Sequence, residues 1–330
     1  MNILVTGATG FIGAALVRRL VQEGHTLRVF HRATSSLRLL EGLEVEHVLG
    51  DLTQPETLEG AMNGVEVVFH AASALSGRDD PGRLYAVTVE GTRSLLRAAR
   101  AAGVQRVVYT SSAAALGVPE EVRKGQNPIL LDENHSWNYR PERWTYGYAK
   151  YLAEMEVQRA VAQGLDAVIV NPSVVYGRGD IYRQSRSLVV QIARRRLPAV
   201  VDAGFNVVHI EDVVDGHLAA MQRGQCGERY ILGGQNMMVH TLVKEIAAVV
   251  GVPAPLVVLP AWLVRHMALP AHWVSPFIEM PVAPETFYLA GYRFYFSTRK
   301  ALTQLGLPPP RPWQDAIREA YAWFKEAGAV

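Results

Sequence analysis

The sequence has little of several features that would point to particular classes of protein. Its single cysteine, Cys226, excludes an intrachain disulfide and has no obvious partner for metal binding or nucleophilic chemistry, so we expect no metal site and a reducing, cytoplasmic environment. The formal net charge is only +2, and the one dense basic run, Arg194 to Arg196, is typical of a solvated helix face, so nothing indicates a nucleic-acid partner. Prolines and the pair Arg265 and His266 interrupt every apolar run before about 20 residues, so no membrane-spanning helix is expected. The first residues lack a charged leader with a cleavage site, and a signal peptide is not expected either.

What the sequence does have is length, apolar content and an alternation of strand and helix patterns. At 330 residues and 49% hydrophobic content, the chain can bury a large core. The pattern predicts a doubly wound parallel α/β sheet of the Rossmann type in residues 1–172, to which 206–222 returns. Prolines cluster beyond it, and we expect 173–330 to be a smaller α/β substrate-binding domain. The candidate strands are Ile3 to Thr6, Thr26 to Phe30, Val45 to Leu49, Val65 to Ala71, Arg106 to Thr110 and Ala167 to Asn171.

Three glycines follow the first predicted strand at intervals of three residues. Gly7, Gly10 and Gly13 stand between that strand and an apolar-periodic helix over 14–20. Glycine permits a tight turn, close approach of a pyrophosphate to the backbone, and close packing of helix on sheet. The phosphate would lie on the helix N-terminus, where free N–H groups favour negative charge. We therefore expect this loop to bind a dinucleotide. The residues assigned to it are Gly7, Thr9, Gly10, Phe11, Ile12 and Gly13.

A second cluster carries groups suited to acid–base chemistry. Tyr146 and Lys150 are four residues apart in a segment predicted as helix, so both side chains lie on one face. A protonated lysine near a tyrosine hydroxyl lowers the pKa of the phenol, and the Ser112 hydroxyl, at a strand end, can orient the same substrate oxygen. Ser112, Tyr146 and Lys150 are the predicted catalytic residues.

Together these motifs resemble the extended short-chain dehydrogenase/reductase family, of the NAD-dependent epimerase/dehydratase type. Within it the chain is similar to the dihydroflavonol-reductase-like branch that includes the hopanoid-associated sugar epimerases. The resemblance covers nearly the whole chain and is far more specific for fold and cofactor class than for substrate. It rests on Thr6 to Gly13, Gly50-Asp51-Leu52, His70-Ala71-Ala72, Tyr109 to Ser112, Tyr146 with Lys150, Asn171-Pro172-Ser173, His209 to Asp212, Thr298 to Ala301, and Leu305-Gly306.

The resemblance implies further cofactor contacts. Asp51 and Leu52 would bracket the adenine, Ala71 and Ala72 would lie against the dinucleotide, and Asn171, Pro172 and Ser173 would lie beside the nicotinamide, as Tyr146 and Lys150 would. The family commonly has asparagine where this chain has Thr88. Threonine keeps a hydroxyl, so we expect this departure to tune the activity and not to abolish it.

Cofactor choice is decided at the end of the second predicted strand. A carboxylate there would bind the ribose hydroxyls of NAD, and an arginine would accept the extra phosphate of NADP. No acidic residue is in reach, and Arg32 stands where dihydroflavonol-reductase-like enzymes bind that phosphate, with Ser35, Ser36 and Arg38 able to assist. The sequence favours NADP over NAD.

The substrate is less well determined. Nucleotide-sugar members of the family hold the sugar's diphosphate with two arginines, and the corresponding positions here are Phe205 and Phe287. Arg178, Arg183, Arg186 and Arg293 are other cations that could serve. The segment 247–290 is rich in aromatic and apolar side chains, including Trp262 and Trp273, which suits a pocket for an apolar molecule. Plain core, a homodimer surface and a lipid contact stay open as alternatives, and core is the strongest for any single aromatic residue.

The sequence thus predicts an NADP-dependent oxidoreductase that interconverts a ketone or aldehyde with an alcohol on an apolar or weakly polar small molecule. Two alternatives stay open. One is a sugar or nucleotide-sugar epimerase or dehydratase, which removes and returns hydride within one turnover. The other is a dinucleotide-binding sensor or assembly protein without turnover, which the presence of both Tyr146 and Lys150 disfavours.

Overall fold

The computed structural model describes residues 1–74, 80–121, 126–180, 187–274 and 285–330. Its centre is a seven-stranded parallel sheet with the strand order β10-β6-β5-β4-β1-β2-β3. The strand order reverses beside β1, as in doubly wound sheets that bind a dinucleotide at this switch point. The predicted fold class is therefore confirmed. The strands are β1 (Asn2–Thr6), β2 (Thr26–His31), β3 (Glu46–Leu49), β4 (Val67–His70), β5 (Arg106–Thr110), β6 (Ala167–Pro172) and β10 (Arg229–Leu232).

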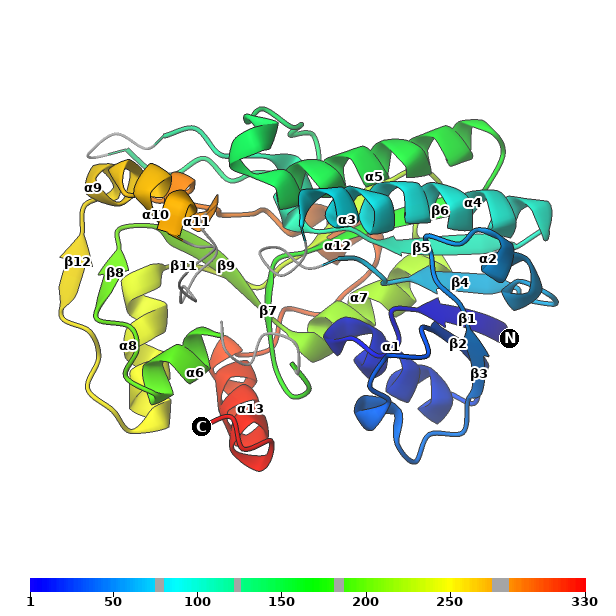
Figure 1. Ribbon diagram of the computed structural model, residues 1–330, viewed down its shortest axis with the longest axis horizontal. Coiled ribbons are helices and arrows are strands. Elements are labelled where there is room, and N and C mark those ends of the chain that lie inside the picture. Colours follow the sequence, from blue (N-terminus) through cyan, green and yellow to red (C-terminus); the bar gives the residue numbers. More distant parts are fainter. Residues whose placement is uncertain (75–79, 122–125, 181–186, 275–284) are drawn as a thin grey trace.

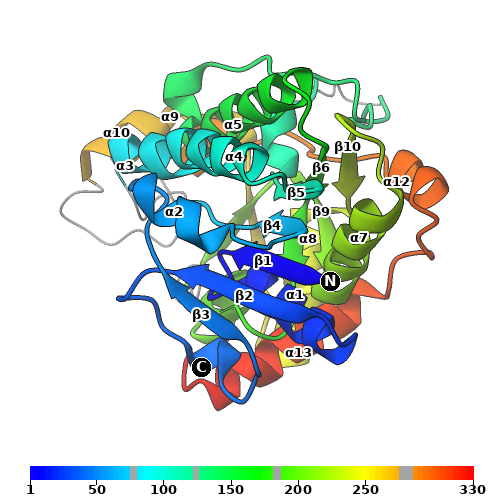
Figure 2. The ribbon, with the colours of Figure 1, turned by 90° about the vertical axis from the view of Figure 1, so that its right-hand side faces the viewer.

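Helices cover both faces of this sheet (Figures 1 and 2). On one face α1 and α7 pack into the larger core cluster, and on the other α2, α4 and α5 pack into a second cluster. The central strands β1 and β4 are buried on both faces, which explains their apolar runs. The helices of this layer are α1 (Phe11–Gln22), α2 (Glu56–Ala61), α3 (Pro81–Tyr85), the π-turn η2 (Ala86–Glu90), α4 (Gly91–Ala101), α5 (Thr145–Ala162) and α7 (Ile210–Arg223).

The remaining elements lie mostly beyond β6. Strands β7 (Val174–Tyr176), β9 (Gly204–His209) and β11 (Gln235–Met238) form a mixed three-stranded sheet, and β8 (Ala199–Val201) pairs with β12 (Val257–Leu259). Their helices are α6 (Leu188–Ala193), α8 (Val239–Val250), α9 (Ala261–His266), α10 (Ala268–Val274), α11 (Glu285–Tyr288), α12 (Arg299–Gln304) and α13 (Trp313–Glu326). Short 3₁₀ turns are η1 (Arg38–Leu40), η3 (Ala113–Leu116) and η4 (Pro141–Arg143).

The chain passes between the two parts more than once. After β9, helix α7 packs on the large sheet, where the Arg106 guanidinium donates to the carbonyl of Met221 at 2.9 Å. Strand β10 then joins that sheet beside β6. The C-terminal helix also contacts the N-terminal part, because the guanidinium groups of Arg38 and Arg178 lie 5.4 and 5.1 Å from the centroid of the Trp323 ring. The domain boundary at residue 172 stays a prediction.

Within the described part of the chain, no helix is both long enough and apolar enough to cross a membrane.

Candidate active site

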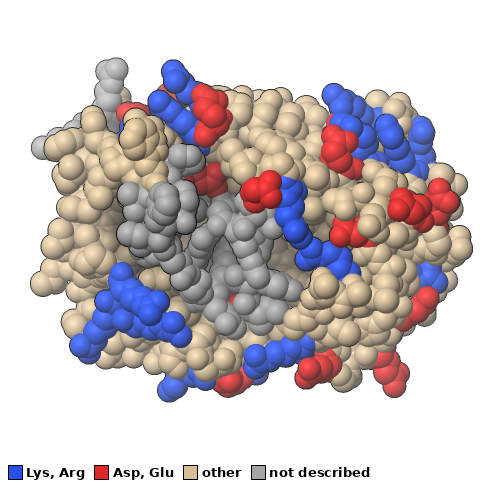
Figure 3. All heavy atoms as spheres, in the orientation of Figure 1, with Lys and Arg blue, Asp and Glu red and all other residues tan. Residues whose placement is uncertain are grey.

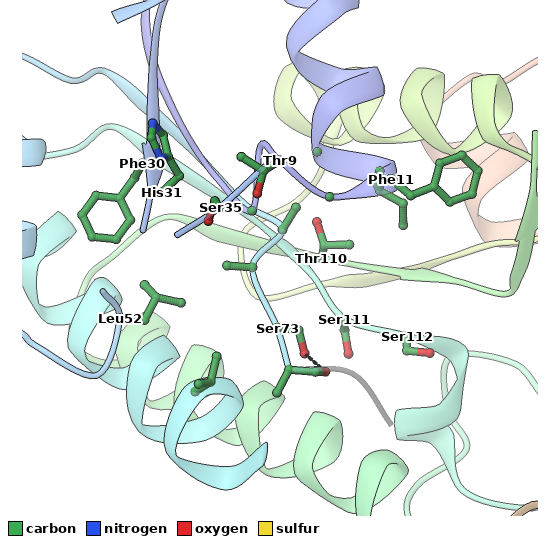
Figure 4. Close-up of a pocket in the computed structure, with 18 of the residues that line it drawn as sticks. Thr9, Phe11, Phe30, His31, Ser35, Leu52, Ser73, Thr110, Ser111 and Ser112 are labelled. Carbon is green, nitrogen blue, oxygen red and sulfur yellow. Dashed lines mark hydrogen bonds between the residues drawn. The ribbon is translucent and has the colours of Figure 1, made fainter. Parts of the chain in front are cut away.

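A cleft of about 580 Å³ lies over the carboxyl ends of the central strands, where doubly wound sheets bind their ligands. It extends from β2, where Phe30, His31 and Leu52 surround one end, to β5, where Ser111 and Ser112 lie at the other (Figure 4). Both motifs singled out in the sequence open into it. The predicted site residues that line it are Gly7, Thr9, Gly10, Phe11, Ile12, Gly13, Arg32, Asp51, Leu52, Ala71, Ala72, Ser112, Tyr146, Lys150, Pro172 and Ser173.

The glycine loop has the geometry that a phosphate site needs. Gly7 has φ +70°, and a Cβ at this position would lie 2.5 Å from the backbone nitrogen of Ala72, so only glycine fits between the two strands. Gly10 precedes α1, and no side chain caps the helix. The amide groups of the first turn therefore face the cleft without a side-chain acceptor, as a pyrophosphate requires. These residues fit a dinucleotide.

The β2 end of the cleft is cationic. Arg32 and Ser35 line it together with Arg83 of α3, which was not predicted from the sequence. Burial tends to raise the pKa of the Asp51 carboxyl, but two hydrogen bonds from Thr53 and the charges of Arg32 and Arg83 outweigh it and lower that pKa. Arg38 lies over the Trp323 ring of α13 and does not line the cleft, and neither does Ser36.

The opposite end holds the acid–base residues. Ser112 lies two residues after β5 and caps η3, accepting a hydrogen bond from the Ala114 amide at 3.2 Å. Tyr146 and Lys150 lie on the first turns of α5, so helical spacing brings both to the cleft. The Lys150 ammonium is buried and donates to the carbonyl of Thr110 at 3.0 Å. Burial lowers the pKa of Lys150 to about 8, and the charge of Glu154 opposes that fall.

Glu154 is a buried carboxylate one helical turn beyond Lys150. It accepts hydrogen bonds from the hydroxyl of Ser111 at 2.5 Å and the amide of Asn171 at 2.6 Å, and pairs with Arg229 of β10 at 3.1 Å. Three different strand ends are thereby tied to α5 beneath the cleft. Its role was not predicted from the sequence. The spacing of four after Lys150 was the available signal, but its partners lie 17 to 75 residues away in the chain.

Asn171 belongs to this buried network and does not line the cleft. Its amide also donates to the carbonyl of Ser112 at 3.0 Å, so it fixes the position of the strand end that carries the Ser112 hydroxyl. Pro172 and Ser173, which follow it, do line the cleft.

Two buried histidines support the strand ends from below. Thr92 donates its hydroxyl to the Thr88 carbonyl, so it accepts from Nε2 of His70, and Nδ1 of His70 accepts from Thr6 at 2.7 Å. Nδ1 of His217 donates to the carbonyl of Val213, so its Nε2 accepts the Thr110 hydroxyl at 2.9 Å. Burial lowers the pKa of His70 to about 3 and that of His217 to about 4, and both rings are neutral.

Thr88 stands where the family commonly has asparagine, and its hydroxyl is used. It lies 3.1 Å from the Ser73 hydroxyl and accepts from the Ala74 amide at 3.4 Å, so it holds the segment after β4 that borders the cleft. The Thr88 hydroxyl is therefore hydrogen-bonded at this position.

The two tryptophans of the aromatic segment 247–290 are exposed, whereas core was the strongest expectation for them. Trp262 and Trp273 are 64% and 76% exposed, so the interpretation of these rings as core is wrong for both, and neither lines the cleft. Phe277, Glu279 and Met280 lie outside the described residues. The helices that carry the two tryptophans bury Ala268 and Ala271 instead.

The two positions of the expected diphosphate clamp are apolar in the structure. Phe205 packs in an aromatic cluster that also contains Tyr146, Trp144 and Phe294, and Phe287 lies in α11. Of the other cations considered, Arg178 pairs with Glu326 of α13, and Arg183 and Arg186 lie outside the described residues.

Comparison with known proteins agrees with this geometry. The family model of the NAD dependent epimerase/dehydratase family matches residues 3–233. The chain is 36% identical to a putative dihydroflavonol 4-reductase of Synechocystis, with 99% of this chain and 95% of that protein covered. It is 35% identical to sterol demethylase protein B of Methylococcus capsulatus over the full length of both. The crystal structure of gox2253 superimposes with a TM-score of 0.84 at 38% identity, covering 99% of each chain.

The family match spans more than half of the chain, and the glycine loop and the Tyr146–Lys150 pair open into one cleft. This chain therefore belongs to the NAD dependent epimerase/dehydratase family, the extended short-chain dehydrogenases/reductases, and is an NAD(P)-dependent reductase, dehydrogenase or epimerase.

Proposed function

We propose that this protein is an NADP-dependent reductase or dehydrogenase that interconverts a ketone or aldehyde with an alcohol on an apolar or weakly polar small molecule. One observation carries the proposal: a single cleft joins a cationic end at Arg32, a glycine loop, and the acid–base residues Ser112, Tyr146 and Lys150. Their order along the cleft matches the order of groups in a dinucleotide, from adenosine phosphate to nicotinamide.

The three acid–base residues would divide the chemistry of proton transfer. The Tyr146 hydroxyl donates a proton to the carbonyl oxygen of the substrate, and the Ser112 hydroxyl orients that oxygen. Lys150, held by the Thr110 carbonyl, places its positive charge beside them and binds the cofactor ribose. The bound nicotinamide supplies or accepts the hydride. Asn171 holds the backbone at Ser112 in place, and Pro172 and Ser173 line this end of the cleft.

The choice of NADP depends on Arg32. Replacement by aspartate removes a charge-assisted phosphate contact of ~1.5 to 3 kcal/mol, so the dissociation constant for NADPH should rise roughly 10- to 150-fold while that for NADH is unchanged or falls. Fluorescence titration of both cofactors measures this. The matched control is Arg97→Asp on the outer face of α4, which makes the same charge change away from the cleft. Equal losses for NADPH and NADH in Arg32→Asp would contradict the assignment.

Three observations support an apolar substrate. Phe205 stands where nucleotide-sugar enzymes would have a clamp arginine, and it shares an aromatic cluster with Tyr146. Phe287 occupies the other clamp position. Two relatives are named for a dihydroflavonol and for a sterol. A diphosphate would therefore lack its main cationic partners here, whereas a ring system would meet aromatic side chains.

Calorimetry with the enzyme saturated in NADPH tests the substrate class. UDP-glucose should bind weakly, because each missing charge-assisted contact costs ~1.5 to 3 kcal/mol, and aromatic or terpenoid ketones should bind more tightly. Micromolar binding of UDP-glucose, with epimerisation and no net oxidation of NADPH, would replace this proposal by the epimerase alternative.

A further inference from the structure

One end of the molecule exposes large apolar side chains at an unusual density. Among the described residues, eight of the fourteen exposed large apolar side chains lie between positions 256 and 273. We call this set the apolar end. Leu256 is 94% exposed, Trp273 76% and Trp262 64%. A patch of this kind on a folded protein marks a surface that contacts something other than water. Its members are Leu256, Val257, Val258, Trp262, Leu263, Met267, Leu269 and Trp273.

The two helices of the apolar end bury small apolar side chains and expose large ones. The Met267 amide bonds to Leu263 at 3.3 Å and the Ala271 amide to Met267 at 2.9 Å, so α9 and α10 follow each other with little interruption. Ala268 and Ala271 are buried, whereas Trp262, Leu269 and Trp273 are exposed at spacings of seven and four. The smallest apolar side chains therefore face the protein and the largest face outward. Packing against the rest of this chain does not account for the two tryptophans.

The flank of the apolar end is cationic. Strands β8 and β12 pair with Val257 beside Ala199, so Leu256 lies next to the segment that follows Arg194, Arg195 and Arg196. All three arginines are exposed, and none has an acidic partner among the described residues. Figure 3 shows a basic cluster at the lower left with uncharged surface above it, at the end where Figure 1 has α9 and β12.

The apolar end itself contributes almost no charge. Between positions 246 and 274 the sequence has one charged side chain, Arg265, and its guanidinium is engaged by Glu121 at 2.6 Å and by the Ala290 carbonyl. His266 is exposed one turn after Trp262, and its ring lies against that of Trp262. The surface is thus apolar and aromatic in its centre and positive at one edge.

We propose that the apolar end docks on the surface of a membrane that contains anionic lipid, without spanning it. Tryptophan rings prefer the level of the lipid headgroups, an outward apolar helix face can enter the acyl boundary, and arginines beside it can pair with lipid phosphates. The charge pattern disfavours a second copy of this chain as the occupant. A two-fold interface would place the apolar end against itself, and the sequence has no carboxylate between positions 246 and 274, so the arginines of either copy would find no acidic partner there.

Vesicle co-sedimentation of the full-length protein tests the proposal. The protein should bind vesicles of phosphatidylcholine with phosphatidylglycerol, bind pure phosphatidylcholine much less, and be released by high salt. Trp262→Ser combined with Trp273→Ser should weaken binding at least tenfold. Arg194→Gln combined with Arg196→Gln should weaken it roughly 25-fold, at about fivefold for each arginine near an anionic surface.

A matched control and an independent readout make the result decisive. Ile129→Ser with Leu130→Ser removes two exposed apolar side chains that do not belong to the apolar end, and it should leave vesicle binding unchanged. Thermal unfolding and NADPH titration check that every variant is folded, and neither depends on the substrate. Two results would overturn the proposal: no binding to anionic vesicles at low salt, or a dimer in sedimentation that the tryptophan variant dissociates.

Discussion

The cleft and the apolar end treat polar and apolar side chains in opposite ways. Around the cleft, polar groups such as Glu154, His70 and His217 are buried, and each has a hydrogen-bond partner on a strand distant in the sequence. At the apolar end, Trp262 and Trp273 are exposed over buried alanines. Burying polar groups costs free energy unless each is hydrogen-bonded, and a bonded network holds the surrounding backbone in one position. An exposed aromatic stripe gains free energy only when a partner covers it. The polar network thus positions the residues of the cleft, whereas the exposed side chains of the apolar end are suited to contact with a partner.

The largest effect is expected from removing the Tyr146 hydroxyl, which should alter the cleft and leave the apolar end unchanged. In Tyr146→Phe the helix and the cofactor residues are unchanged, but the proton donor is lost, so turnover with a surrogate ketone should fall by about two to four orders of magnitude. NADPH binding should stay nearly the same, and so should vesicle binding. Retained turnover in this variant would move the proton donor to another residue.

The buried histidines predict a loss of stability in acid. Both are neutral in the folded protein, with pKa values of about 3 for His70 and about 4 for His217, against 6.5 in the unfolded chain. Below pH 6.5 the unfolded chain binds more protons, so stability falls as the pH drops toward the folded values. From pH 7 to pH 5 the two rings together should cost roughly 3 to 4 kcal/mol of unfolding free energy.

Urea unfolding at pH 7 and pH 5 measures this, and His217→Gln provides the comparison. With one titrating ring removed, the variant should lose roughly half as much stability over that interval, whatever its stability at pH 7. An unchanged pH dependence in the variant would show that His217 is not the neutral buried ring described above.

A smaller effect is expected from the carboxylate beneath the cleft. Glu154 raises the pKa of Lys150, which burial otherwise lowers, so Glu154→Gln should move that pKa below about 8 and leave less charged lysine at alkaline pH. We expect a roughly three- to fivefold loss of kcat/KM at pH 8, and a shift of the alkaline limb of the pH profile to lower pH.

The matched control is Glu156→Gln, which removes a carboxylate from the same helix. Glu156 pairs with Arg93 and Arg159 and not with the groups beneath the cleft. Its pH profile should follow that of the unsubstituted enzyme. If Glu154→Gln also kept the unshifted profile, Glu154 would be a structural residue without influence on Lys150.

The cleft was largely predictable from the sequence because its residues follow parallel strands, whose carboxyl ends meet at one edge. The six predicted strands agree with the structure within two residues. Strand β10 was not predicted, because four residues after a long helix carry too little periodicity to indicate a seventh strand. Glu154 and His217 were missed for another reason. Their roles depend on partners that only the tertiary structure brings near, such as Arg229 and Thr110.

The apolar end marks the limit of sequence reasoning in this chain. Apolar composition is the same for a core, a pocket wall and an exposed stripe, and core is the usual outcome for tryptophan. The three-dimensional structure separates these cases, because Trp262 and Trp273 are exposed while Ala268 and Ala271 are buried.

The central claim is net oxidation and reduction of an apolar substrate at this cleft, and isotope transfer tests it most directly. NADPH deuterated at C4 of the nicotinamide, on each face in turn, is incubated with the enzyme and an apolar ketone that binds in calorimetry. One NADPH should be consumed for each alcohol formed, with deuterium from one face on the new carbinol carbon. In Tyr146→Phe the labelled alcohol should form about two to four orders of magnitude more slowly. Isomerised substrate with the cofactor and its label unchanged would contradict the claim.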